Sequence, residues 1–267
     1  ASGAAIARMD PEARAAALCL APGCGLAPGY VTALAAEALE TAGPADQITV
    51  FVGVLPARPD NRLGYANIWG IEGLVREYTA PCLALKAGQA IELAALTEPE
   101  TVYLNGLEFE AFTTAGSLDS LVRDHQGRVG ALVFKTLRYP GHLDHILFLL
   151  ADLGLAKRLY QFRTLLTTAL PRTEEDRVLI AIRRRSEGCE SWTSRLLCPA
   201  RDAAGQAVSA ASTATAAHVC ATLDLIATGR TGPGVIEPGG LRPRLLRKSP
   251  FLDLVDAAAM TNRRGGA

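Results

Sequence analysis

The sequence lacks an excess of either charge, because it contains 27 Lys and Arg residues and 27 Asp and Glu residues. Nucleic-acid-binding surfaces and polybasic membrane surfaces usually require a positive excess, so the balance argues against both. The sequence also has no apolar run of the roughly 20 residues needed to span a bilayer, and no signal-peptide pattern at its N-terminus. We therefore expect a cytoplasmic protein whose partner is a small molecule or a second copy of the chain; pairing with a second copy would make it a homodimer.

Cysteine is sparse, with six residues in the chain, and no two cysteines form a C-x-x-C pair. This pattern argues against a zinc knuckle, a thioredoxin motif and a disulfide scaffold. We interpret the cysteines as buried thiols in a reducing compartment. His142 and His145 are spaced as i and i+3, but no further ligands with clear spacing accompany them, so we expect no metal site.

A nucleotide-phosphate motif is also missing, since neither G-x-G-x-x-G nor a P-loop occurs anywhere in the chain. What is present is an alternation of helical and strand patterns, which predicts an α/β (α+β) fold with a mixed sheet. Residues 10–18 and 30–42 are typical of helices, and the continuously apolar run at residues 48–55 is typical of a buried strand. This first part has the pattern of the end of an α/β unit.

The rest of the chain has the pattern of further strands and helices. Residues 82–114 have the pattern of several short strands, and residues 176–185 and 191–198 that of an antiparallel pair. A long helix is expected over residues 209–227. The segment Phe251–Ala259 predicts a short final helix, and we expect the closing residues 263–267 to be frayed.

Three clusters of residues are candidates for chemistry. The first is the loop from Gly23 to Gly29, which places Cys24, Gly25, Pro28 and Gly29 just before a helix. Glycines allow the backbone to approach a ligand closely, and a helix N-terminus offers free N–H groups. An ordinary turn between a strand and a helix would have the same pattern.

The second cluster is K-T-L-R-Y-P-G-H, Lys135 to His142, at a switch from strand to helix. Pro140 and Gly141 force a turn there, and Arg138 could bind a substrate carboxylate through two parallel hydrogen bonds. The alternative is a capped helix start with a solvated strand end.

The third cluster lies between Tyr65 and Tyr78. An ammonium-bearing substrate requires a carboxylate and an aromatic wall, which Glu72 or Glu77 with Tyr65 and Trp69 could provide. Alternatively, Glu72 and Arg76 form a plain surface pair at i and i+4, and Trp69 belongs to the core.

In this order the clusters resemble the saccharopine-dehydrogenase-like family, and within it the lysine 6-dehydrogenase group. The resemblance covers most of the chain and is carried by these segments: Cys24–Gly29, Gly53–Trp69, Glu72–Tyr78, Leu107–Gly116, Lys135–His142 and Thr213–Gly229. The sequence departs from the family at Arg62, where proline is usual, at Gly70, where serine is frequent, and around Glu237.

The resemblance implies hydride transfer between NAD or NADP and a carbon that carries an amine, through an imine. It places Cys24, Gly25, Pro28 and Gly29 near the nicotinamide. Tyr65, Trp69, Arg138 and Tyr139 would face the substrate. Because the amine must lose a proton before hydride leaves, a base is needed; His142 is the first candidate, with Glu72 or Glu77 behind it. Alternatives are saccharopine or carboxynorspermidine dehydrogenation, or a ligand-binding or dimerisation module without catalysis.

The resemblance also implies a domain organisation. Residues 1–54 would be the C-terminal remnant of a dinucleotide-binding domain, residues 55–208 a substrate and dimerisation domain, and residues 209–267 a helix and tail returning toward the nucleotide domain. A complete Rossmann domain takes on the order of 100–150 residues, and that amount is expected to be missing. If its cover is absent, Ala-rich faces such as that of the helix at residues 30–42 should expose apolar surface.

Overall fold

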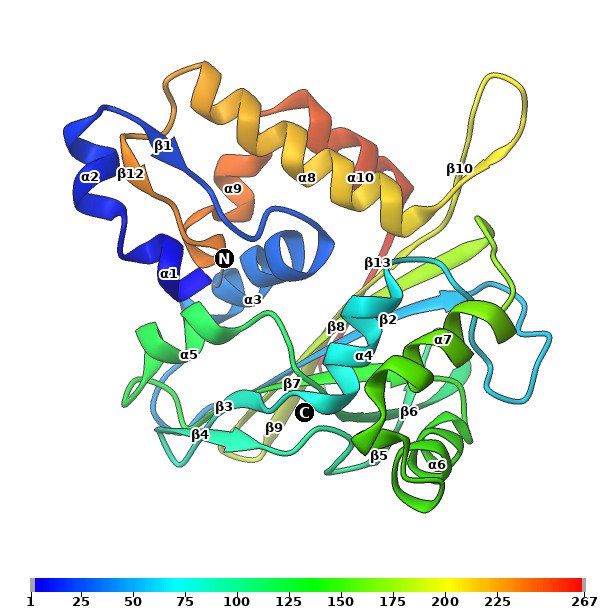
Figure 1. Cartoon of the computed structure of the whole chain (residues 1–267). Coiled ribbons are helices and arrows are strands. Elements are labelled where there is room, and N and C mark those ends of the chain that lie inside the picture. The colour runs from blue at the N-terminus through cyan, green and yellow to red at the C-terminus, as the bar shows by residue number, and fades with distance from the viewer. Residues whose placement is uncertain (1–2, 266–267) are drawn as a thin grey trace.

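The computed structural model, which describes the backbone of residues 3–265 and the side chains of residues 5–255, is built around a nine-stranded mixed sheet. The main strand order is β13-β9-β8-β2-β7-β3-β4, and β6 pairs with both β5 and β7 (Figure 1). β2 and β7 run parallel, and the other pairs are antiparallel. The predicted α/β (α+β) fold with a mixed sheet is confirmed. The strands are β2 (Gln47–Pro56), β3 (Cys82–Lys86), β4 (Gln89–Leu93), β5 (Glu100–Leu104), β6 (Leu107–Thr113), β7 (Ala131–Arg138), β8 (Asp176–Ser186), β9 (Cys189–Leu197) and β13 (Ala259–Gly265).

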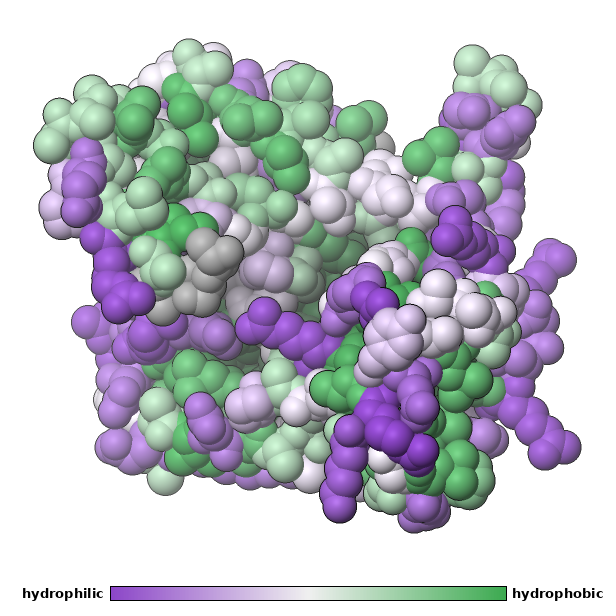
Figure 2. Space-filling view, viewed as in Figure 1, coloured by the Kyte–Doolittle hydropathy of each residue, from purple (hydrophilic) through white to green (hydrophobic). Residues whose placement is uncertain are grey.

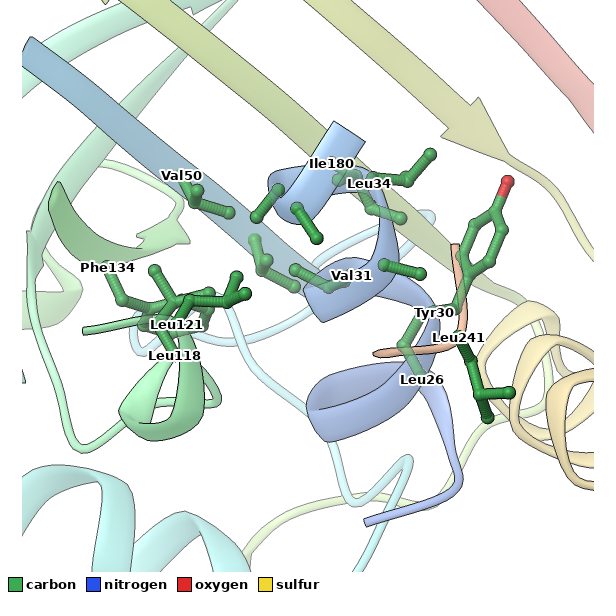
Figure 3. Packing of buried hydrophobic residues seen from close by; sticks show 14 of the residues in the cluster. Leu26, Tyr30, Val31, Leu34, Val50, Leu118, Leu121, Phe134, Ile180 and Leu241 are labelled. Carbon is green, nitrogen blue, oxygen red and sulfur yellow. The ribbon is translucent and has the colours of Figure 1, made fainter. Parts of the chain in front are cut away.

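Helices cover both faces of this sheet. Each face carries buried apolar side chains, because the side chains of successive strand residues point to opposite faces. In β2, Ile48, Val50 and Val52 belong to one buried cluster, whereas Phe51 and Leu55 belong to the other. Figure 3 shows the first cluster, in which the α3 side chains pack on β2 and β8. The first cluster includes residues of α3 (Val31–Leu39), α5 (Asp119–His125), α8 (Ala210–Ala227), α9 (Pro243–Leu246) and α10 (Asp253–Ala258); the second includes residues of α4 (Ile71–Thr79), α6 (His142–Leu147) and α7 (Leu159–Ala169).

Smaller elements complete the chain. β1 (Cys19–Leu20) pairs in parallel with β12 (Gly234–Val235), and β10 (Ala200–Arg201) forms a short hairpin with β11 (Ala207–Val208). The helices α1 (Gly3–Ala7) and α2 (Asp10–Ala15) lie at the N-terminal end, and α2 contacts β1 and β12 (Figure 1).

The sequence analysis assigned the strand β2 to the end of an N-terminal α/β unit. In the structure it pairs with β8 through ten residues and with β7 through six. The proposed division after residue 54 therefore cuts through a strand at the centre of the sheet. Sequence periodicity identified the strand but carries no information about its partners.

The Ala-rich helix α3 was expected to expose apolar surface, and this prediction is wrong. Val31, Ala33, Ala35 and Ala36 have an exposed fraction of 0%. The sheet covers one side of α3, and the 3-10 turn at Pro238–Gly240 and α9 contact it elsewhere. Alanine is abundant there because small side chains allow close packing on several sides.

The C-terminal segment also differs from expectation. The final helix α10 ends at Ala258, and residues 259–265 pair with β9 as an edge strand. The prediction that residues 263–267 are frayed is therefore wrong for residues 263–265, and residues 266 and 267 lie outside the described part of the chain. Backbone pairing with β9 gives these residues the hydrogen bonds that their polar sequence did not suggest.

The long helix α8 begins at a well-defined cap. The Ser209 hydroxyl accepts a hydrogen bond from the Ser212 N–H, and the buried Asp176 carboxylate accepts from the Ser209 hydroxyl and from the N–H groups of Ala210 and Ala211. An acidic group at a helix N-terminus is stabilising.

Among the described helices, α8 is the one long and apolar enough to cross a membrane by length and composition. Eight of its residues are buried against the rest of the protein, so a core position accounts for its apolar character.

None of the six cysteines forms a disulfide bond within the described part of the chain. Cys82 is buried, but Cys189 and Cys198 are exposed, so the interpretation of all six as buried thiols is wrong. Cys189 is the first residue of β9, and Cys198 follows its last residue.

Candidate functional site

A cavity of about 300 Å³ lies where the loop before α3 meets the sheet, α4 and the first turns of α8. Figure 2 shows the surface hollowed between the α8 side and the α4 side of the molecule. Val52 and Val54 of β2 and Phe134, Thr136 and Arg138 of β7 form its floor, since these alternate residues share one face. The remaining lining residues are Gly23, Cys24, Gly25, Leu26, Ala27, Pro28, Trp69, Glu77, Ala211 and Thr215.

The loop Gly23–Gly29 was predicted to approach a ligand, and the structure places Cys24, Gly25 and Pro28 on the cavity wall. The Cys24 thiol donates to the Ala21 carbonyl at 3.2 Å, and burial raises its pKa, so the thiol stays protonated at neutral pH. Gly29 is absent from the lining and lies against α8. Its φ is +127°, and a Cβ there would lie 3.0 Å from the His218 ring and 3.1 Å from the Gly23 carbonyl oxygen. This position therefore requires glycine for both conformation and space.

Arg138 is the charged centre of the site and has an exposed fraction of 2%. Its Nε donates to the Tyr78 hydroxyl at 2.8 Å, its Nη1 to the Leu137 carbonyl at 2.9 Å and its Nη2 to Glu77 Oε2 at 3.2 Å. Its guanidinium carbon lies 4.8 Å from the centre of the Tyr65 ring. Burial alone would lower the pKa of Arg138, but its interactions with Tyr78, Tyr65 and Glu77 raise it, so the charge is permanent.

A hydrogen-bond relay leads from Arg138 away from the cavity. His142 Nδ1 lies 2.8 Å from the Leu63 carbonyl oxygen, which can only accept, so Nδ1 carries the proton. Nε2 is then the acceptor, and the Tyr78 hydroxyl donates to it over 2.8 Å. Burial, with the nearby charge of Arg138, lowers the pKa of His142 to about 3. His142 is thus neutral, has both ring nitrogens occupied and does not line the cavity.

Glu77 is the carboxylate that the structure brings to the cavity. Its side chain is 23% exposed, and Oε2 accepts from Arg138. Burial raises its pKa to about 7, although the charge and hydrogen bond of Arg138 act in the opposite direction. A carboxyl group with this pKa can take up or release a proton near neutral pH.

Glu72, one turn earlier on α4, lies on the opposite side of the helix. Its side chain is 74% exposed and forms an ion pair with Arg163 of α7 at 3.2 Å. The sequence analysis had grouped Glu72 and Glu77, but the structure places them on different sides of α4. Two positions five residues apart on a helix point in directions that differ by roughly 140°. The expected surface pair between Glu72 and Arg76 is replaced by this pair between helices.

The predicted aromatic wall is formed in part. Trp69 lines the cavity, and its Nε1 donates to the Tyr65 hydroxyl at 2.8 Å. Its ring packs on Gly73, where any side chain would clash. Tyr65 is buried behind the wall, where burial raises its pKa to about 12. Tyr139 is not among the lining residues, because its hydroxyl donates to the Pro56 carbonyl at 2.9 Å and its ring packs against Phe109.

Sequence reasoning missed two residues. Tyr78, which links Arg138 to His142, was treated only as the end of a helical segment. His218 is completely buried beneath the loop Gly23–Gly29, and neither ring nitrogen has a hydrogen-bond partner among the described residues. Burial lowers its pKa to about 4. The spacing of Ala211, Thr215 and His218 at i, i+4 and i+7 could have placed them on one helix face.

No group of three or more His, Cys, Asp or Glu side chains in the described part of the chain has an arrangement that could hold a metal ion. His145, which sequence spacing pairs with His142, instead bonds through Nδ1 to the Gly141 carbonyl at 2.5 Å.

Comparison with known proteins relates this geometry to a family. The model of the saccharopine dehydrogenase C-terminal domain matches residues 25–257. The fold is similar to the saccharopine dehydrogenase (L-Glu forming) of Saccharomyces cerevisiae, with a TM-score of 0.71, 15% identity, and coverage of 100% of this chain and 78% of that chain. It is also similar to the homospermidine synthase of Legionella pneumophila, solved in complex with NAD, with a TM-score of 0.56, 12% identity, and coverage of 87% and 56%. The chain therefore belongs to the saccharopine dehydrogenase family, whose C-terminal domain it matches over most of its length.

Proposed function

We propose that this protein takes part in the NAD- or NADP-dependent oxidation of an amine in an amino acid, with Glu77 as the base. The observation that carries the proposal is that Glu77 faces the cavity with a pKa of about 7, beside the permanent charge of Arg138. An amine of the lysine 6-dehydrogenase type is the substrate class we favour. The family membership supports an oxidoreductase of this general kind.

The chemistry assigns Glu77 a proton-transfer role. A protonated amine must lose a proton before its carbon can release hydride, and Glu77 is the cavity carboxylate placed to receive it. Protonation of Glu77 would leave the Arg138 charge without its counter-ion. A substrate carboxylate already bound to the guanidinium would then serve as its counter-ion.

Arg138 retains capacity for such a substrate. Three of its five guanidinium N–H groups have partners among the described residues, on Tyr78, Leu137 and Glu77. The remaining N–H groups belong to Nη1 and Nη2, the edge that binds carboxylates through two parallel hydrogen bonds. The face of Trp69 would provide the apolar wall for the substrate's methylene chain.

The residues present fit one end of a nicotinamide cofactor. Gly25 lines the cavity, and a Cβ there would occupy space at ordinary contact distance, 3.4 Å from the Pro28 carbonyl oxygen and 3.6 Å from Thr215 Cγ2, so the glycine leaves that space to a ligand. We assign Cys24, Gly25 and Pro28 to the nicotinamide side. The cofactor, when bound, supplies the hydride acceptor. The chain itself contains no glycine-rich fingerprint for its phosphates.

The test is an oxidation assay of the purified protein with L-lysine, saccharopine and carboxynorspermidine, each with NAD⁺ and NADP⁺, alongside calorimetric titration of both nucleotides. Formation of reduced nicotinamide with one amine identifies the substrate and the cofactor. Binding of an amino acid without any binding of nucleotide would contradict the proposal and support the alternative of a non-catalytic ligand-binding module. The variants Glu77→Gln and Glu72→Gln form a matched pair on the same helix, and only the first should lower turnover.

A further inference from the structure

A second cavity, of about 490 Å³, lies at the C-terminal end of β2, away from the site described above. Its lining is strongly cationic and comprises Ala57, Arg58, Thr173, Glu175, Arg177 and Arg201. Three arginines and one glutamate line it, which leaves two uncompensated positive charges among the lining residues of a chain whose net charge is zero. We propose that this cavity binds a dianionic phosphate group, either free or carried by a small organic molecule.

The cationic residues reach the cavity from three separate segments. Arg58 follows β2, Arg177 lies near the start of β8, and Arg201 lies in the β10–β11 hairpin. Figure 1 shows the loop after β2 and this hairpin on the same side of the molecule. Guanidinium groups that converge from different directions suit a tetrahedral oxyanion, because each can donate to a different oxygen.

The backbone holds two of these segments in a fixed relation. Leu55 pairs with Arg177 in the sheet, and the Ala57 N–H donates to the Glu175 carbonyl at 2.8 Å. Arg177 Nη2 donates to the Ala57 carbonyl at 2.7 Å, which anchors the guanidinium while leaving other N–H groups free for a ligand. The Thr173 hydroxyl accepts from the Glu175 N–H at 3.0 Å, so its own proton remains available as a donor.

One carboxylate of the lining neutralises one of its three arginines. Glu175 pairs with Arg201 at 2.7 Å, where both side chains are more than half exposed. Asp176, next in sequence, is fully buried and is bound by the N-terminus of α8 instead. Arg58 has no ion-pair partner among the residues that the structure describes. Arg58 is exposed and unpaired, and Arg177 is only partly anchored. A bound anion would therefore supply the negative charge that these two guanidinium groups lack.

The inference is independent of the proposed redox chemistry, because it shares no residue with the first cavity. The test is calorimetric titration of the purified chain with inorganic phosphate at constant ionic strength, followed by a phosphate monoester such as glycerol phosphate and by glutarate. Saturable binding of both phosphates is expected, with glutarate weaker by about tenfold, since its two planar carboxylates are separated by three carbons and cannot arrange their oxygens tetrahedrally around one centre, which loses a charged hydrogen bond. Saturation by inorganic phosphate alone would identify the free ion as the ligand, and tighter binding of the ester would identify an organic phosphate.

Variants provide the control. Arg58→Gln and Arg177→Gln should each weaken phosphate binding by about tenfold, whereas Arg185→Gln, which removes an exposed arginine elsewhere on β8, should leave it unchanged. Glu175→Gln should strengthen binding, because it removes the one carboxylate, and misfolding cannot mimic a gain in affinity. The proposal is overturned if phosphate does not saturate, if glutarate binds as tightly as phosphate, or if Glu175→Gln leaves the affinity unchanged or reduced.

Discussion

Arg138 Nη2 lies 3.2 Å from Glu77 Oε2, and the two side chains differ in their access to the cavity. Arg138 is 2% exposed and is tied to Tyr78 and Leu137, whereas Glu77 is 23% exposed and is held by this one ion pair. The pair therefore combines a fixed positive charge with a carboxyl group whose protonation state can change near neutral pH.

Replacement of Glu77 tests this relationship directly. As a base, Glu77 must be deprotonated, so kcat/KM should rise with pH through about 7 and level off above it. Glu77→Gln should lower kcat by about 100-fold or more and remove this rise. The pH–rate profile of the two proteins provides the measurement. Glu72→Gln should retain the wild-type profile, and a loss of activity in that variant would show that the wrong glutamate has been chosen.

His142 should behave as a positioning residue. The variant His142→Ala removes the acceptor for the Tyr78 hydroxyl and leaves a cavity, so the free energy of unfolding should fall by roughly 2–4 kcal/mol. The rise of kcat/KM through pH 7 should remain in whatever activity survives. Urea denaturation and the pH–rate profile measure the two effects. Disappearance of the rise would restore His142 as the base.

Arg138 controls the proton affinity of Glu77. In Arg138→Met the carboxylate loses its counter-ion, so the pKa of Glu77 and the rise in the pH–rate profile should move to higher pH, with an increase in KM for the amino acid. Arg138→Lys keeps a positive charge and should show a smaller displacement. Nucleotide binding should be unaltered in both variants. Equal losses of nucleotide and amino-acid binding would contradict a role confined to the substrate and Glu77.

The buried His218 makes a prediction about stability. Its pKa is about 4 when folded and near 6.5 when unfolded, so the unfolded chain binds a proton more readily as pH falls below 6.5. The folded state should therefore lose roughly 2 kcal/mol between pH 7.5 and pH 5 through this residue. Denaturation curves at both pH values should show a smaller loss for His218→Leu. An identical loss in the variant would mean that the imidazole is protonated or hydrogen-bonded in the native protein.

The loop before α3 can be tested at Gly29. Gly29→Ala forces a Cβ against the His218 ring and the Gly23 carbonyl at a φ of +127°, which should cost about 1–3 kcal/mol of stability. Combining it with His218→Ala removes the side-chain contact but not the backbone strain. The double variant should therefore recover part of the loss, and thermal unfolding of the four proteins measures this coupling.

Much of the fold follows from the sequence because hydrophobic periodicity is local. The strand predicted at residues 48–55 and the helix start predicted near His142 each followed from a few neighbouring residues, and the structure has β2 at Gln47–Pro56 and α6 beginning at His142. The pairing of β2 with β7 and β8 could not be predicted in this way, since it joins residues that are far apart in the chain. The same limit explains why a domain boundary was placed inside the sheet.

Some residues of the candidate site could likewise be predicted from the sequence, and others could not. Arg138 and the loop at Cys24 stand out because their residue types suit a ligand, and both line the cavity. The choice between Glu72, Glu77 and His142 depends on side-chain direction and solvent access, which a sequence pattern does not specify. Tyr78 and His218 were missed because their roles depend on contacts with distant segments.

The central position of β2 has a consequence for synthesis of the chain. Gln47 pairs with Arg185, which lies 138 positions later in the chain. At a translation rate of roughly 5–20 residues per second, β2 waits on the order of 10 seconds or more before its β8 partner is made. Its apolar segment could attract other nascent strands during that interval. We therefore expect production of the protein to depend on chaperones that bind newly made chains, more than its final stability would suggest.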